Sequence, residues 1–146
     1  MAEPLIRVAV HADLGALRDL YRRSSLSNAG DRASLLAHPE ALEFAGDAVG
    51  EGLTRVAVVD GRIVGFATLL GDGELEDLFV DPDWMRRGIG RALVLDAVVL
   101  APAHGLDRIE VTANGEALDF YESVGFVYDG EVETAFGRGS RMHRDC

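Results

Sequence analysis

The clustering of apolar and β-branched residues along the chain predicts most of the strands. Residues 5–10 predict a first strand, and residues 55–59 and 62–70 predict the two arms of a β-hairpin. An Asp-Gly pair at 60–61 separates these arms and is typical of a tight hairpin turn. The segment ELEDLFV at 74–80 follows a second Gly-rich turn, so we expect it to add a further antiparallel strand.

Apolar residues three or four positions apart predict the helices. A first helix is expected over 13–21, and the composition of 24–30 predicts a loop after it. The run after Gly90 is apolar nearly all round, which predicts a buried helix that stops at Pro102. A short helix is expected over 116–124, before a Gly-Phe pair.

The order of these elements predicts an α+β fold. Further strands are expected over 108–112, 126–128 and 139–143. A helix connects the strand at 74–80 to the strand at 108–112, and a crossover of that length makes two strands parallel. We therefore expect a mostly antiparallel sheet with one parallel βαβ step. A chain of 146 residues without internal repeats is expected to form one domain.

The charge of the chain narrows the choice of partners. A formal charge of −11 and a pI near 4.6 argue against nucleic acid, whose phosphates require a basic surface, and against anionic membranes. The acidity favours a cationic partner, although acidity for solubility alone explains it equally well. The N-terminus lacks the pattern of a signal peptide, and the longest apolar run is too short to span a membrane. We therefore expect a cytoplasmic protein.

Residues 86–91, Arg-Arg-Gly-Ile-Gly-Arg, are the first candidate for chemistry. A helix start offers unpaired N–H groups and the positive end of the helix dipole, and glycine lets the backbone approach a phosphate closely. A P-loop is excluded because Gly-Lys-Ser/Thr is absent. A dinucleotide fingerprint fits poorly, because Leu93 stands where glycine or alanine is needed and about seven residues separate Val80 from Gly88.

This segment resembles the acyl-CoA-binding segment of the GNAT N-acetyltransferase superfamily, whose usual pattern is Gln/Arg-x-x-Gly-x-Gly/Ala. Gly88 and Gly90 match its glycines, whereas Met85 stands where the family has Gln or Arg. The second half of the family pattern follows at the expected distance, as Asn114 and then Ala-x-x-Phe-Tyr and Gly-Phe within 117–126. The hairpin and the opening strand-helix segment are also similar to this family, so the resemblance covers essentially the whole chain.

The resemblance implies a fold, an activity and a co-substrate. The fold is a GNAT-type three-layer α/β/α arrangement, with a central mixed, mostly antiparallel sheet splayed between the strand 74–80 and the strand 107–112. Residues 1–146 would form a single N-acetyltransferase domain. The implied reaction transfers an acetyl group from acetyl-CoA, without a metal, to a primary amine. Members of this family are often dimers, so a homodimer is a further expectation.

The acetyl-CoA site is assigned by the resemblance alone. Backbone groups of the strand at 78–80 would bind the pantetheine arm, and the amides of 86–91 with one arginine side chain would bind the pyrophosphate. Either Arg86 or Arg87 fits that last role. The implied cofactor-binding residues are Leu78, Phe79, Val80, Arg86, Arg87, Gly88, Ile89, Gly90, Arg91, Asn114, Ala117 and Phe120.

Tyr121 is the family's usual general acid towards the CoA sulfur. The alternative is a core aromatic packed beside Phe120. Asn114 would bond the pantetheine or help to place Tyr121, and a simple cap at the end of the strand is an equally good interpretation.

The general base is expected among the carboxylates of the strand at 74–80, because an alkylammonium with a pKa of about 10.4 must lose a proton before it attacks. Strict alternation puts Glu74 and Glu76 on one face of this strand with Leu78 and Val80, and Asp77 on the other face with Leu75 and Phe79. By position in the family pattern, Glu76 is the first candidate for the base, Glu74 is the second, and Asp77 would contact the substrate ammonium. The alternative is that these are solvated surface charges.

Three functions therefore remain open. The first is acetylation of a cationic small molecule, and the second is acetylation of a protein or peptide amine. The third is a non-catalytic acyl-CoA-binding module, for which Met85 is the motive. Retention of Tyr121 argues for an enzyme, since a pure binder does not need a phenol that protonates a thiol.

Overall fold

The computed structural model describes residues 3–27, 32–115, 117–134 and 137–146. Its strands are β1 Leu5–Val8, β2 Thr54–Val59, β3 Arg62–Leu69, β4 Leu75–Val80, β5 Arg108–Ala113, β6 Val127–Thr134 and β7 Gly137–Asp145. Its α-helices are α1 Leu14–Ser27, α2 Arg32–Ala37, α3 Asp47–Gly50, α4 Ile89–Leu100 and α5 Leu118–Ser123. Short 3-10 turns occur at His11–Asp13, Pro39–Leu42, Pro82–Trp84 and Ala101–His104.

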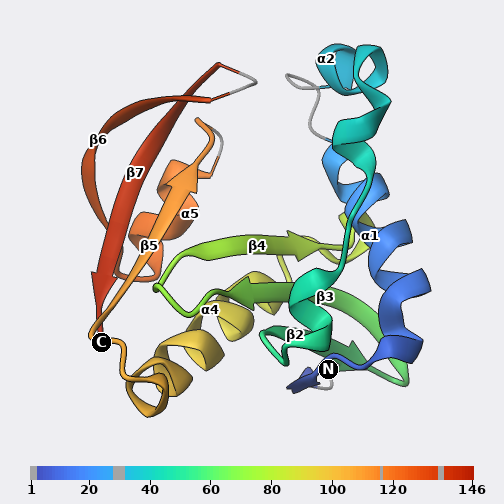
Figure 1. The fold of residues 1–146 in the computed structure, drawn as a ribbon, viewed down its shortest axis with the longest axis horizontal. Helices are drawn as coiled ribbons and strands as arrows, with labels where there is room; N and C mark the ends of the chain where they lie inside the picture. The colour runs from blue at the N-terminus through green and yellow to red at the C-terminus, as the bar shows by residue number, and fades with distance from the viewer. Residues whose placement is uncertain (1–2, 28–31, 116, 135–136) are drawn as a thin grey trace.

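Two antiparallel sheets meet in a V (Figure 1). One has the strand order β1-β2-β3-β4, and the other has the order β5-β7-β6. They join at a parallel bridge between Glu74 and Glu110, where the Glu110 N–H donates to the carbonyl of Gly73 at 2.9 Å. Beyond this point β4 and β5 diverge, as Figure 1 shows. The predicted α+β fold, splayed between these two strands, is confirmed.

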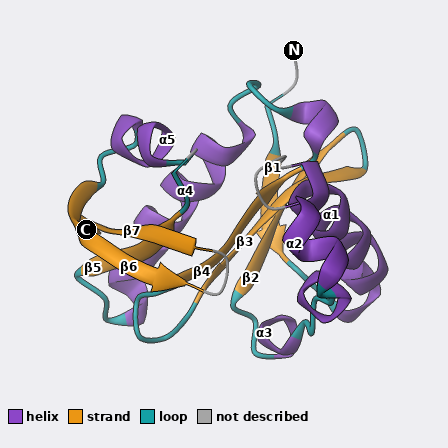
Figure 2. Ribbon diagram, turned by 90° about the horizontal axis from the view of Figure 1, so that it is seen from above, coloured by secondary structure: helices purple, strands orange, loops and turns teal. Residues whose placement is uncertain are grey.

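Helices α1 and α4 cover opposite faces of the four-stranded sheet (Figure 2). Leu17 and Leu20 of α1 pack against Val56 and Phe66 in one buried cluster. Residues of α4 and α5 form the larger cluster together with the inward faces of β3, β5 and β7. The sheet is therefore the middle one of three layers. Within the described residues, no helix combines the length and the apolar character that crossing a membrane requires.

A β-bulge interrupts β4. Leu69 of β3 pairs with Leu75, but the next residue back, Thr68, pairs with Asp77, so Glu76 is the extra residue. The strict alternation predicted for this strand is wrong across the bulge: Leu75 lies in the α4 cluster together with Leu78 and Val80, while Phe79 packs on the α1 side. An extra residue reverses the facing of every side chain after it.

Some predicted boundaries also change. Helix α1 continues to Ser27, so residues 24–27 are helical rather than a loop, and 28–30 lie outside the described residues. The predicted helix over 116–124 is α5, and Glu116 is likewise outside the described residues. The last strand, β7, is longer than the predicted 139–143 because it pairs with both β5 and β6. Helix α4 ends at Leu100, and Pro102 lies in the 3-10 turn that follows.

Candidate active site

A cavity of about 1040 Å³ lies beside β4, where the two sheets diverge. Its walls come from β4, from the segment that leads into α4, from the start and body of α5, and from the last turns of α1. Of the residues assigned to acetyl-CoA, those that line it are Leu78, Phe79, Val80, Arg86, Gly88, Ile89, Gly90, Arg91, Asn114, Ala117 and Phe120. Tyr121 lines the same cavity. The fold thus brings together residues that lie more than 40 positions apart in the sequence.

The chain turns sharply before α4 through two residues with positive φ. These are Arg86, at φ 62°, and Gly88, at φ 81°, which is the N-cap residue of the helix. The N–H groups of the first turn have no partner within the helix, because no residue precedes them at the required spacing. A side chain at Gly90 would place its Cβ 3.2 Å from Phe120 Cζ and 3.6 Å from Val80 Cγ2. This turn, with its amide donors and its lack of a side chain at Gly90, fits a pyrophosphate group.

The structure distinguishes the two adjacent arginines of this turn. The guanidinium of Arg87 lies over the ring of Trp84, 4.7 Å from its centroid. Arg86 lines the cavity, and so does the exposed Met85. A guanidinium on an aromatic face already has a favourable contact, so Arg86 is the better placed of the two for a phosphate.

Asp81, between β4 and this turn, is an anchor that was not expected from the sequence. Its side chain is fully buried and accepts two hydrogen bonds from Arg23 of α1, each 3.0 Å, and one from Arg62 at 3.2 Å. It also accepts a bond from the Asp83 N–H at 3.0 Å. The hydrogen bonds from Arg23 hold the pKa of the Asp81 carboxyl below its usual range. Asp81 thereby connects helix α1 to the turn at 86–91, which we call the phosphate turn.

Tyr121 is buried among aromatic rings. Its ring centroid lies 5.2 Å from that of Phe120 and 5.3 Å from that of Phe126. Burial raises the pKa of the Tyr121 phenol above its ordinary value, so the group stays protonated at neutral pH. Tyr121 is both a core aromatic and a wall of the cavity, so the two interpretations of this residue are compatible. A phenol in this state can donate a proton and is a poor base.

Asn114 acts as a cap in this structure. Its Oδ1 accepts a hydrogen bond from the Ala117 N–H at 2.9 Å. The Ala117 carbonyl in turn accepts from the Tyr121 N–H at 3.0 Å. Asn114 therefore fixes the start of the turn that carries Tyr121, and it also lines the cavity.

The three carboxylates of the 74–80 segment occupy different environments. Glu74 is paired with Arg141 of β7, whose Nη1 donates to both of its oxygens at 2.9 and 3.0 Å. Glu76, in the bulge, is exposed. Asp77 is half-buried on the α1 side, where burial raises the pKa of its carboxyl to about 6 and the nearby charge of Glu76 adds to this. The exposed Glu76 is the carboxylate of this segment most open to solvent.

Helix α1 contributes residues to the cavity, and Tyr21 among them was not suggested by the sequence. Tyr21, Ser24 and Ser25 line it together with Leu78 and Tyr121. The spacing of Leu17, Leu20, Tyr21 and Ser24 continues the helical pattern, and this was the available signal. The serines favoured the prediction of a loop over 24–30, so the helical pattern was not extended to Ser24. A hydroxyl-bearing helix face therefore stands beside the candidate CoA groove.

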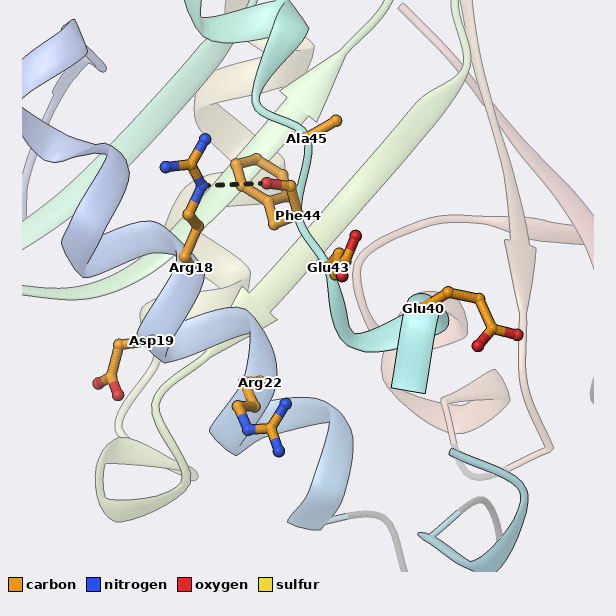
Figure 3. Close-up of a pocket in the computed structure, with 7 residues that line it drawn as sticks. All are labelled: Arg18, Asp19, Arg22, Glu40, Glu43, Phe44 and Ala45. Carbon is orange, nitrogen blue, oxygen red and sulfur yellow. Dashed lines mark hydrogen bonds between the residues drawn. The ribbon is translucent and has the colours of Figure 1, made fainter. Parts of the chain in front are cut away.

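A second hollow, of about 660 Å³, lies between α1 and the segment 40–45 (Figure 3). Its walls carry Arg18, Asp19 and Arg22 from the helix, and Glu40 and Glu43 from the following segment. Arg18 Nε donates to the Phe44 carbonyl at 3.3 Å. The exposed charges of both signs are mixed, and no residue assigned to the reaction lies here. We assign the chemistry to the larger cavity.

A sheet layered between helices on both faces, a splayed β4–β5 junction, a turn that fits a pyrophosphate and a buried phenol together are the features of a CoA-dependent acyltransferase. The family model of the acetyltransferase (GNAT) domain matches residues 37–143, and the chain belongs to this family. The protein is accordingly an N-acetyltransferase that uses acetyl-CoA.

Individual proteins of the family are similar over most of the chain. The peptidyl-lysine N-acetyltransferase YjaB of Salmonella typhimurium is 36% identical over 129 residues, which are 88% of this chain and 86% of that one. The crystal structure of a GCN5-related N-acetyltransferase from Rhodopseudomonas palustris superposes with a TM-score of 0.82 at 25% identity, covering 100% of this chain and 98% of that one. The PaiA N-acetyltransferase of Thermoplasma acidophilum, in complex with coenzyme A, has the same fold, with a TM-score of 0.78 at 19% identity and coverage of 99% and 100%.

Proposed function

We propose that this chain, acting as a single domain, acetylates a primary amine through the cavity described above. The observation that carries the proposal is that one cavity joins the phosphate turn at 86–91 to the phenol of Tyr121. Binding of the co-substrate and protonation of its leaving group would then occur at the two ends of one groove.

Each step has a residue in a suitable state. Glu76 would accept a proton from the acceptor ammonium, directly or through one water, which frees the nitrogen lone pair for attack. A backbone N–H within 78–80 would donate to the thioester oxygen as negative charge develops there. As the carbon–sulfur bond breaks, the Tyr121 hydroxyl would donate its proton to sulfur. The nitrogen of the tetrahedral intermediate would lose its second proton to solvent. Solvent would then return a proton to Tyr121 and remove one from Glu76.

The acceptor that we propose is a cationic amine, with a peptide lysine as the first candidate. The chain carries a net charge of −11, and Glu76 and Asp77 follow one another on β4. The relative that shares 36% identity over 88% of this chain is named a peptidyl-lysine acetyltransferase. A free polyamine is the second candidate, because Leu-Glu-Asp at 75–77 resembles the pattern of polyamine-type members.

A panel of acceptors tests this proposal. The protein is incubated with acetyl-CoA and, in separate reactions, with lysine peptides, polyamines, aminoglycosides or free amino acids, and the released thiol is measured. We expect release above the acceptor-free rate with lysine peptides, and mass spectrometry should place the acetyl group on the lysine side chain. Release with polyamines alone would favour the second candidate. CoA binding without release for any acceptor would contradict the proposal.

A further inference from the structure

The described part of the chain buries three polar side chains completely, those of Thr54, Thr68 and Asp81. Two ion pairs, with Arg23 and Arg62, offset the free-energy cost of burying Asp81. The two threonines lie on the sheet face covered by α1, next to Val56 and Phe66. A buried hydroxyl costs free energy unless it is hydrogen-bonded, and none of the steps above uses these two.

These threonines continue a row that ends at a site residue. Thr54 of β2 lies opposite Thr68 of β3, and Thr68 lies opposite Asp77 of β4. The two threonine Oγ1 atoms are 2.9 Å apart. Thr68 lies directly opposite Asp77, and a hydrogen bond from its hydroxyl lowers the pKa of the Asp77 carboxyl. Directly opposed residues of antiparallel strands project to the same face. Thr54, Thr68 and Asp77 thus form a polar row across three strands, which we call the Thr54–Thr68–Asp77 row.

The row depends on the bulge at Glu76. Without the extra residue, Asp77 would share a face with Leu75 and would point towards α4. With it, Asp77 projects towards α1 and meets Thr68. The bulge and the buried threonines are therefore parts of one arrangement.

The hydroxyl protons have a defined order when Asp77 is ionised. A carboxylate only accepts hydrogen bonds, so Thr68 must donate to it. A hydroxyl has one proton to donate, so the Thr68 oxygen accepts from Thr54. A protonated Asp77 no longer requires Thr68 to be the donor. The Thr54–Thr68–Asp77 row therefore stabilises the ionised form of Asp77.

We propose that Thr68, supported by Thr54, is a positioning residue that orients the Asp77 carboxylate and keeps it ionised towards an acceptor ammonium. The inference rests on the proposed function to the extent that Asp77 meets the acceptor. Two titratable groups lie near Asp77. One is Glu76 on its own strand, whose charge raises the pKa of Asp77, and the other is Tyr21 of α1, whose own pKa is raised by burial and by the charge of Asp77. Burial raises the pKa of Asp77 to about 6, and the hydrogen bond from Thr68 opposes that rise.

The direct test is the titration of Asp77 followed by carboxyl-carbon NMR, with Asp77→Asn to identify the signal. Thr68→Val keeps the shape and removes the hydroxyl, whereas Thr68→Ser keeps the hydroxyl and removes the methyl. We expect the Asp77 midpoint to rise by about one pH unit in Thr68→Val, to rise less in Thr54→Val, and to stay near 6 in Thr68→Ser. Val56→Ala creates a cavity on the same face of the sheet without removing a hydroxyl, so it should leave the Asp77 midpoint unchanged.

An unchanged midpoint in both valine variants would overturn the inference, and so would an equal rise in Thr68→Ser. This readout needs no turnover. Where an acceptor is known, the acid limb of kcat/KM should move with the midpoint, which at pH 6 is a loss of about fivefold for Thr68→Val. If Asp77→Asn leaves KM for the acceptor unchanged, the role proposed for Asp77 fails while the titration still decides the role of Thr68.

Discussion

At the scale of single residues, the partner of a carboxylate separates two candidates for the base. Glu74 is held by Arg141, which also bonds Thr112 at 2.9 Å, and a carboxylate engaged in this way must break an ion pair before it takes a proton. Glu76 is exposed in the bulge and has no such requirement. The resemblance to the family alone ranked Glu76 before Glu74 as the base. The ion pair of Glu74 with Arg141 supplies a physical reason for that order.

Glu76→Gln should therefore lower kcat by about 10² or more, because general-base catalysis typically contributes that much. Glu74→Gln should lower kcat by less than about tenfold. Steady-state rates over a range of pH measure both, and a larger loss of kcat in Glu74→Gln would show that Glu74 is the base. Asp129→Asn, on the exposed pair with His143, is a matched control that should keep the wild-type kcat.

The adjacent arginines give the second prediction at this scale. Removing a charge-assisted hydrogen bond costs about 1.5–3 kcal/mol, which corresponds to a loss of affinity of about 10- to 100-fold. Arg86→Ala should weaken acetyl-CoA binding by this amount, whereas Arg87→Ala should do so by only a few fold, because Arg87 lies on Trp84. Calorimetric titration with CoA measures both, and the opposite ranking would contradict the assignment. Two adjacent arginines look alike in sequence, and only the structure shows that Arg87 packs on Trp84 while Arg86 lines the cavity.

At the scale of elements, β4 shows where periodicity stops being informative. Its existence, direction and neighbour were predictable from its apolar residues and the preceding turn. The bulge was not predictable, because either assignment of the alternating residues 74–80 to the two faces of the sheet places charged and apolar side chains on both faces. Only pairing with β3 determines which residue is extra. The same limit applies to α1, whose last turn is helical despite its serines because Leu17 and Leu20 anchor the helix on the sheet.

The connection between α1 and the end of β4 gives a prediction on stability. Asp81→Asn keeps the shape of the side chain but loses the charge that faces Arg23 and Arg62, so we expect a loss of about 1.5–3 kcal/mol in the free energy of unfolding at pH 7. Asp145→Asn, on an exposed pair with Arg108, should cost at most about 1 kcal/mol. Urea unfolding measures both.

The pH dependence of this effect has a definite sign. The pKa of Asp81 is held below its unfolded value, which is about 3.9, so its contribution is complete above that value and is lost as the pH falls through the folded pKa. The difference between wild type and Asp81→Asn should therefore be constant near neutrality and should shrink below about pH 4. A difference that persists unchanged at lower pH would contradict the assignment to this carboxylate.

At the scale of the whole molecule, the sequence predicted the architecture better than the acceptor side of the site. The order β2-β3-β4 follows from two hairpins, and the step from β4 to β5 follows from one crossover. The phosphate turn follows from local glycine spacing, so short segments of the sequence determine these features, whereas the position of β7 between β5 and β6 was not predicted. The acceptor side depends on α1 and on the Thr54–Thr68–Asp77 row, whose members lie far apart in the chain. Neither threonine belongs to a recognisable motif, and no local pattern in the sequence indicated their contact.

The central claim is that this fold carries out acetyl transfer with Tyr121 as the proton donor to sulfur. Its most direct test compares wild type with Tyr121→Phe, using the best acceptor of the panel. Because the ring and its packing against Phe120 and Phe126 are kept, CoA affinity measured by calorimetry should be unchanged, while kcat falls by about 10² or more. Wild-type kcat in Tyr121→Phe would contradict this account.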